Sequence, residues 1–228
     1  MKIGLAYAMA GEIAHLLPRA DLLETVCGVS IYRLDCDIYA YVGGVGKVNA
    51  AMSTQLFIDR YQPDFIINAG VAGSLKDLPV GTIVLAEDFV QHDVDTSPMG
   101  DRVGLVSTVN CLSFPTARLS LAKSLLHRIG VAYQVGRVAT GEVFMTRGRR
   151  ADWVLETFSA TLCEMEGGAI AQVCLRNGIP FTALKSVSDR ICGKNNAEEY
   201  FNYPEAMAKL NDILLPFARL LRDSETEE

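Results

Sequence analysis

The sequence has fewer positively than negatively charged residues and is poor in histidine. Its 228 residues include 21 Lys and Arg against 27 Asp and Glu, so the formal net charge is -6 at pH 7. A chain with this balance presents no basic surface for nucleic acids, and we expect no nucleic-acid partner. Only three histidines occur, and there is no HExxH motif. We therefore expect no metal site, and no motif indicates a cofactor.

Paired cysteines and long apolar runs are also missing. The six cysteines show no CxxC spacing and lie mostly in apolar segments, where a free thiol behaves as a small hydrophobic group. No run reaches the roughly 18 apolar residues of a membrane span. The first apolar stretch is broken by Gly11, Glu12 and His15, which favours a strand leading into a helix over a signal peptide. We expect a cytoplasmic protein with no membrane partner.

Apolar strands alternate with amphipathic helices along the whole chain, without a linker or an internal repeat. Strands are predicted at 2–9, 63–70, 82–93, 133–141, 160–165 and 180–189, with further strand residues over 23–44. Helices are predicted from Gly11, at 46–61, from Pro115, and at 147–158, 168–178 and 204–222. This pattern predicts an α/β fold: one domain over 1–228, a three-layer α/β/α sandwich with a mixed, mainly parallel central sheet. Residues 94–114 are irregular and predict a functional or partner-facing loop.

Three carboxylates follow predicted strands, at the positions where open α/β sheets bind ligands. They are Glu12, Glu166 and Asp189, and few positive charges accompany them. This set predicts a pocket for a neutral, partly apolar ligand whose reaction passes through a cation. The glycine-rich turns at 43–46 and 70–73 match neither the dinucleotide motif nor the P-loop, and by themselves indicate only tight turns.

Each acidic residue also has a purely structural interpretation. Glu12 and Glu166 each begin a predicted helix, whose positive end favours an ionised acid, and Asp189 has the position of a helix cap. Glu164 is expected to face outward by strand alternation. Three acids at neighbouring strand ends favour the functional interpretation. For His92 and Asp93 we expect a local hydrogen-bond network rather than direct catalysis.

Seven motifs in order carry a family resemblance: KIGLAYAMAGEI, GGVGKVNAA, INAGVAGSL, HDVD, TGEVFM, EMEGGAIAQVC and SVSD. From Met1 to about residue 220 the chain resembles the nucleoside phosphorylase/nucleosidase superfamily, and within it the 5′-methylthioadenosine/S-adenosylhomocysteine nucleosidases. The resemblance implies hydrolysis of the N-glycosidic bond between adenine and a 5′-thio-substituted ribose. It also implies a homodimer in which the loop after HDVD reaches toward the neighbouring site.

The resemblance assigns roles to matching positions. Asp189, oriented by Ser188, is expected to protonate purine N7, which requires a carboxyl pKa raised by burial. Glu12 is expected to activate the attacking water, and Glu166 to hold the ribose hydroxyls and stabilise the cationic sugar. The other expected substrate-binding residues are Met9, Val45, Val71, Ala72, Gly73, Phe144, Met145, Met165 and Lys185. Among them, Phe144 is expected to stack on adenine.

Two positions depart from the family pattern. Lys185 stands where the family usually has arginine, and Val71 where it often has serine or threonine. The first loop holds Glu12 and no arginine, which favours water over phosphate as the nucleophile. Two alternatives stay open: a purine nucleoside phosphorylase, and a nucleoside-binding homologue with little turnover. Residues 94–114 and the pair Tyr200-Phe201 are expected to shape the pocket for the 5′ group.

Overall fold

The computed structural model describes residues 1–192 and 203–224, so the pair Tyr200-Phe201 lies outside the described residues. The predicted mixed α/β architecture is confirmed. The strands are β1 (Ile3–Tyr7), β2 (Asp21–Val26), β3 (Val29–Asp35), β4 (Ile38–Val42), β5 (Phe65–Ser74), β6 (Ile83–Gln91), β7 (Phe114–Pro115), β8 (Tyr133–Thr140), β9 (Leu162–Glu164) and β10 (Phe181–Arg190). The helices are α1 (Ala10–Ile13), α2 (Lys47–Tyr61), α3 (Leu119–Arg128), α4 (Arg149–Phe158), α5 (Gly167–Asn177) and α6 (Tyr203–Asp223).

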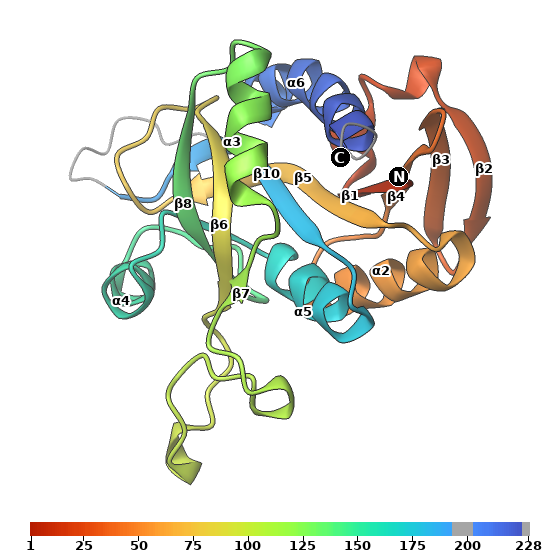
Figure 1. The fold of residues 1–228 in the computed structure, drawn as a ribbon. Coiled ribbons are helices and arrows are strands. Elements are labelled where there is room, and N and C mark those ends of the chain that lie inside the picture. The colour runs from red at the N-terminus through yellow and green to blue at the C-terminus, as the bar shows by residue number, and fades with distance from the viewer. Residues whose placement is uncertain (193–202, 225–228) are drawn as a thin grey trace.

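The strand pairings close part of the sheet into a ring. β5 pairs with β10, β10 with β6, β6 with β8, β8 with β9, and β9 returns to β5. From β5 the sheet continues as an open arm through β1, β4, β3 and β2 (Figure 1). The alternation of strands and helices in the sequence did not predict this closure, which leaves no free edge among the five ring strands. One consequence is that β9, only three residues long, has neighbours on both sides.

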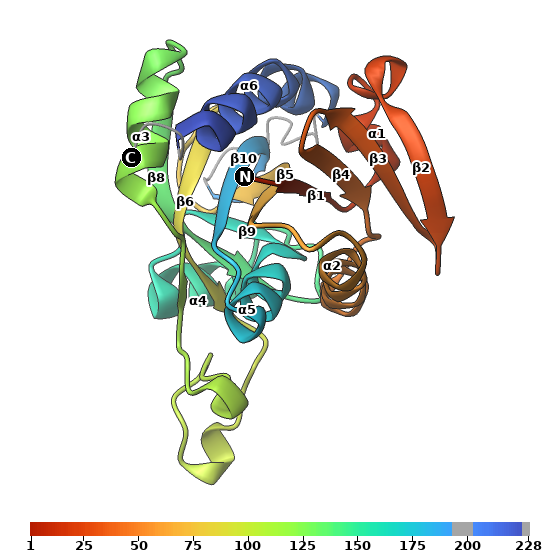
Figure 2. The same ribbon diagram turned by 45° about the vertical axis from the view of Figure 1, so that its right-hand side comes forward.

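Helices pack on both faces of the sheet and bury two separate apolar clusters. On one face α3 and α6 contribute Leu125, Leu214 and Phe217. On the other, α2 and α5 contribute Phe57 and Ile170. Figure 2 shows α6 and α2 on opposite sides of β1 and β5. Because β1 and β5 are covered on both faces, they are almost continuously buried, as the apolar runs in the sequence predict.

One predicted helix is shorter than expected, and one predicted helix start is wrong. The helix expected from Gly11 ends at Ile13, and a short 3₁₀ turn follows over Leu17–Arg19, because Pro18 has no N–H to continue the hydrogen bonds of an α-helix. The helix expected at Pro115 begins at Leu119. Pro115 instead belongs to the two-residue strand β7, where its missing N–H is tolerated, and pairs with Asp88 in the carboxyl-terminal half of β6.

The segment between β6 and β7 projects from the body of the molecule, as both ribbon views show (Figures 1 and 2). It carries two 3₁₀ turns, Ser97–Met99 and Ser107–Val109, and no longer element. Across the part of the chain that the structure describes, no helix has the length and apolar character needed to span a membrane.

Candidate active site

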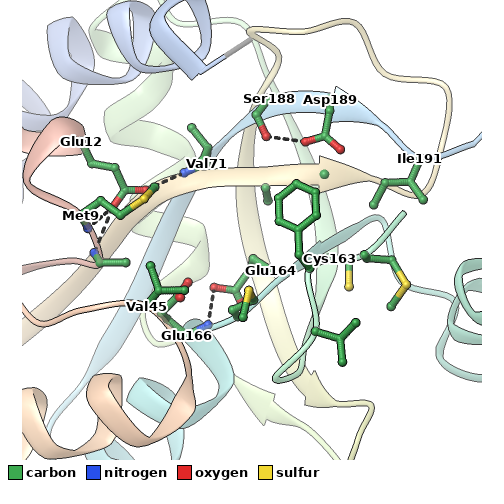
Figure 3. A pocket seen from close by; sticks show the side chains of 17 residues that line it. Met9, Glu12, Val45, Val71, Cys163, Glu164, Glu166, Ser188, Asp189 and Ile191 are labelled. Atoms are coloured by element: carbon green, nitrogen blue, oxygen red, sulfur yellow. Dashed lines mark hydrogen bonds between the residues drawn. The ribbon is translucent and has the colours of Figure 1, made fainter. Parts of the chain in front are cut away.

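A cavity of about 310 Å³ lies at the carboxyl-terminal parts of β1, β5, β9 and β10. Twelve of the predicted site residues line it: Met9, Glu12, Val45, Val71, Ala72, Gly73, Phe144, Met145, Met165, Glu166, Ser188 and Asp189. Figure 3 shows the three predicted acids, Glu12, Glu166 and Asp189, around this one space. The strand-end argument from the sequence therefore identified residues that the fold brings together.

Glu12 is buried, and backbone donors hold its carboxylate. Oε2 accepts hydrogen bonds from the N–H groups of Ala8 and Met9, both at 2.9 Å, and Oε1 accepts one from Val71 at 3.2 Å. Burial raises the pKa of Glu12, and the backbone donors and the charge of Lys185 only partly oppose it. Glu12 also has the capping role of its structural interpretation, because its carboxylate accepts from the N–H of Met9, the cap residue of α1.

Glu164 is also buried and faces inward, so the prediction that it faces outward is wrong. Its Oε2 accepts hydrogen bonds from Lys185 Nζ at 2.9 Å and from the N–H groups of Gly167 and Glu166 at 2.7 and 3.2 Å. Its Oε1 accepts one from the Thr140 hydroxyl. Burial raises the pKa of Glu164, but Lys185 and these donors outweigh it, so the carboxyl pKa lies below its usual value.

Glu166 occupies the cap position of α5 and accepts a hydrogen bond from the Gly46 N–H at 2.8 Å. This contact joins the glycine-rich turn before α2 to the cavity. Burial, together with the negative charge of Glu164, raises the pKa of Glu166 to about 7. The carboxyl group can therefore change its charge near neutral pH.

Asp189 lies near the end of β10, across the cavity from Glu166 (Figure 3). The Ser188 hydroxyl donates to its Oδ1 at 2.7 Å. The backbone of β5 comes close on the other side, since a Cβ on Gly73 would lie 3.0 Å from Asp189 Oδ2. A register shift between β10 and β5 falls between Val187 and Asp189, and such irregularities redirect side chains at functional sites.

The predicted network near His92 forms around Asp93 instead. Asp93 accepts from Lys47 Nζ at 2.6 Å and from the Glu142 N–H at 2.9 Å. His92 is buried, and neither ring nitrogen has a hydrogen-bond partner among the described residues. It lies against Gly141, where a Cβ would approach the imidazole Nε2 to 2.3 Å. His92 does not line the cavity in the part of the chain described here.

The cavity wall is acidic and apolar. The described lining residues include four carboxylates and no Lys, Arg or His. A site with this charge favours a ligand that is neutral or becomes positive and disfavours an anion such as phosphate.

Comparison with known proteins identifies the family. The sequence pattern of the Phosphorylase superfamily matches residues 2–219. The 5′-methylthioadenosine/S-adenosylhomocysteine nucleosidase of Geobacillus thermodenitrificans is 37% identical over 219 residues, which cover 92% of this chain and 92% of that protein. The chain belongs to this nucleosidase family. The family predicted from the seven motifs is confirmed.

Solved structures of a nucleosidase of this kind and of a futalosine hydrolase share the fold. The Colwellia psychrerythraea nucleosidase, solved in complex with adenine, superposes with a TM-score of 0.84 at 31% identity, covering 95% of this chain and 94% of that one. A mutant of the Helicobacter pylori futalosine hydrolase superposes with a TM-score of 0.85 at 26% identity, covering 96% and 99%. Both are similar over nearly their whole length.

In this member of the nucleosidase family, one predicted substrate-binding residue, Lys185, lies away from the cavity wall. Lys185 does not line the cavity in the described residues, and its ammonium group pairs with Glu164 instead. The predicted contact between Lys185 and a substrate thus has no support in this geometry. Val71, the other departure, does line the cavity, and its N–H holds Glu12.

Five lining residues were missed by the sequence argument: Ala8, Val143, Cys163, Glu164 and Ile191. Each lies within two positions of a predicted residue, so a wider window around every strand end would have included them. For Cys163, burial raises the thiol pKa to about 12, which keeps the sulfur protonated and weakly reactive. It contributes an apolar surface to the cavity.

Proposed function

We propose that the protein hydrolyses the N-glycosidic bond of 5′-methylthioadenosine, S-adenosylhomocysteine or both, releasing adenine and the 5′-thio-substituted ribose. One observation carries this proposal: Glu12, Glu166 and Asp189 surround a single cavity whose described wall has no basic side chain. Membership of the nucleosidase family and the adenine bound in the similar Colwellia psychrerythraea structure support it.

In the proposed reaction the bond between C1′ and the purine nitrogen N9 breaks, and its electron pair leaves with the base. Asp189 donates a proton to N7, so that adenine departs neutral, and Ser188 orients the donor through its 2.7 Å hydrogen bond. A water molecule adds to C1′ and gives a proton to Glu12. Atoms and charges then balance, with adenine and the free sugar as products.

Two features of the acids support this division of roles. Burial raises the pKa of Glu12, which makes its carboxylate a stronger base once ionised. Glu166, in its ionised form, offers acceptors for ribose hydroxyls and a negative charge beside the cationic sugar of the transition state. Groups that interact more strongly with the transition state than with the substrate are the ones that raise the rate.

Water is the proposed nucleophile because the described wall of the cavity offers no basic side chain to bind phosphate. A phosphate co-substrate needs arginine or lysine donors, and the described wall has none. Of the two basic side chains of β10, Lys185 is 2% exposed and pairs with Glu164, and Arg190 pairs with Asp77.

The experiment is an adenine-release assay on purified protein with methylthioadenosine and S-adenosylhomocysteine, with and without phosphate. The proposal expects adenine without phosphate, and a loss of about 10² to 10⁴-fold in Asp189→Asn. Release that requires phosphate would identify a phosphorylase. Tight nucleoside binding without any product would identify a binding homologue.

The proposal includes the remaining sequence predictions. These are one three-layer α/β/α domain over 1–228, a cytoplasmic location and a homodimer. Free thiols at Cys27, Cys36, Cys111, Cys163 and Cys174 support a reducing compartment. Exposed apolar side chains on α2 and on the projecting segment, Val48, Met52 and Met99, support a partner surface. Sedimentation at micromolar concentration tests the dimer, and a purely monomeric profile would contradict it.

A further inference from the structure

The cap of α5 is made in an unusual way. A residue at the cap position normally turns its side chain back onto the first N–H groups of its own helix. Glu166 holds this position but makes no such bond, and its carboxylate points to the Gly46 N–H and the cavity. The N–H groups of Glu166 and Gly167 are bound by Glu164 instead. The next N–H, that of Gly168, is bound by the Thr140 hydroxyl at 2.8 Å.

We propose that Glu164 is a positioning residue, which caps α5 in place of Glu166 and so leaves the Glu166 carboxylate available to the ribose. This inference rests on the proposed nucleosidase function. Glu164 lines the cavity, but each of its carboxylate oxygens is already bound by protein donors. It therefore acts on the reaction through Glu166.

Lys185 and Thr140 both bind Glu164, and the three side chains form one hydrogen-bonded unit. Lys185 balances the charge of Glu164 where both side chains are 2% exposed, and an uncompensated charge there would be costly. Because Lys185 and Asp189 lie on the same strand, the ion pair ties the strand of the proposed acid to the helix of the ribose acceptor. Thr140 adds β8 to the same unit through Glu164.

The unit also sets the charge state of Glu166. The ionisable groups facing Glu166 are Glu164 on β9, Lys185 on β10 and Glu12 on α1, with the Gly46 N–H from the turn before α2. Glu164 and Glu12 oppose its ionisation, whereas Lys185 and Gly46 favour it. Removing the charge of Glu164 therefore eases ionisation of Glu166, which a purely mechanical cap would not do.

The test compares Glu164→Gln with wild type in adenine release from pH 5 to 9. The amide keeps one acceptor but loses the charge and the fit to the N–H donors. We expect kcat/KM on the plateau to fall by about 100-fold through misplacement of Glu166. We also expect the acidic limb of the profile to move by about one pH unit to lower pH. An unmoved limb or an unchanged plateau would overturn the proposal.

Two further variants separate the effects. Thr140→Val loosens the cap without changing charge, and should lower the plateau and leave the limb in place. Asp88→Asn breaks the ion pair with Arg137, which joins β6 to β8 outside the cavity, and should leave both features unchanged. If Glu164→Gln does not fold, the double variant Glu164→Gln/Lys185→Met removes both buried charges. A folded double variant with the wild-type profile would then overturn the proposal.

A binding experiment distinguishes failure of this proposal from failure of the proposed function. If wild-type protein releases no base, calorimetry with a nucleoside analogue that carries a cationic sugar nitrogen replaces the rate. Binding should strengthen as Glu166 ionises. A lower pH for this change in Glu164→Gln than in wild type would support the positioning role. Binding with the same pH dependence in both would overturn it.

Discussion

Gly70 offers a sharp test of the position of Glu12. It lies in β5 beside the Glu12 carboxylate, and a Cβ added there would lie 2.6 Å from Oε1 and 3.3 Å from Cδ. Ordinary contacts of such a carbon begin near 3.4 Å. Gly70 does not have a positive φ, so alanine fits the backbone. In Gly70→Ala the carboxylate must therefore move, and the shift is about 0.8 Å.

Such a shift should lower the rate strongly without unfolding the protein. Glu12 is held by three backbone N–H groups, and it cannot move without weakening them. A displacement of this size typically costs about 100-fold in rate, or about 2.7 kcal/mol in the activation barrier. The assay is steady-state adenine release, with kcat and KM determined separately and the Tm measured on the same preparation.

Gly4→Ala is the matched control. Gly4 lies in β1 near its amino end, and a Cβ there would approach the Phe57 ring to 2.4 Å, in the core rather than at the cavity. This variant should lose stability and keep its kcat. The reasoning is refuted if folded Gly70→Ala retains kcat within about threefold of wild type, or if Gly4→Ala loses as much kcat as Gly70→Ala.

Three further predictions concern the acids and the thiols. Burial and the charge of Glu164 raise the pKa of Glu166 from 4.5 to about 7, so its ionisation costs stability as the pH rises through this window. Glu166→Gln should therefore raise the Tm at pH 8 and change it little at pH 4, and an equal Tm at pH 8 would contradict this. Ser188→Ala removes the hydrogen bond to Asp189 and should lower kcat about tenfold; an unchanged kcat would count against the orienting role. A thiol reagent followed by mass spectrometry should label exposed Cys36 rapidly and buried Cys163 only after unfolding, and rapid labelling of both would be inconsistent with the buried thiol.

The sequence predicted the site well where local rules were sufficient. The carboxyl ends of parallel strands meet at one edge of a sheet, so Glu12 and Asp189 were predicted together although 177 positions separate them in the chain. The end of α5 was likewise predicted, since Gly178 adopts a φ of 68°, the left-handed conformation in which glycine ends helices.

The wrong predictions share one physical cause. Each of these residues is placed by a contact with a residue distant in the sequence, which a local pattern does not include. Strand alternation placed Glu164 outward, but β9 has neighbours on both sides in a closed ring, and its buried charge is balanced by Lys185, 21 positions away. The position of Lys185 was missed for the same reason. Pro115 was assigned to a helix start because its pairing partner, Asp88, lies 27 positions earlier and outside any local window.

The most direct test of the account is the origin of the oxygen that joins C1′ of the sugar. The reaction is run with methylthioadenosine in ¹⁸O-labelled water containing unlabelled phosphate, and the products are analysed by mass spectrometry. Activation of water by Glu12 predicts a free 5′-thio-substituted ribose that carries one solvent oxygen from a single turnover, with no sugar phosphate. A sugar 1-phosphate without solvent label, formed together with adenine, would contradict it.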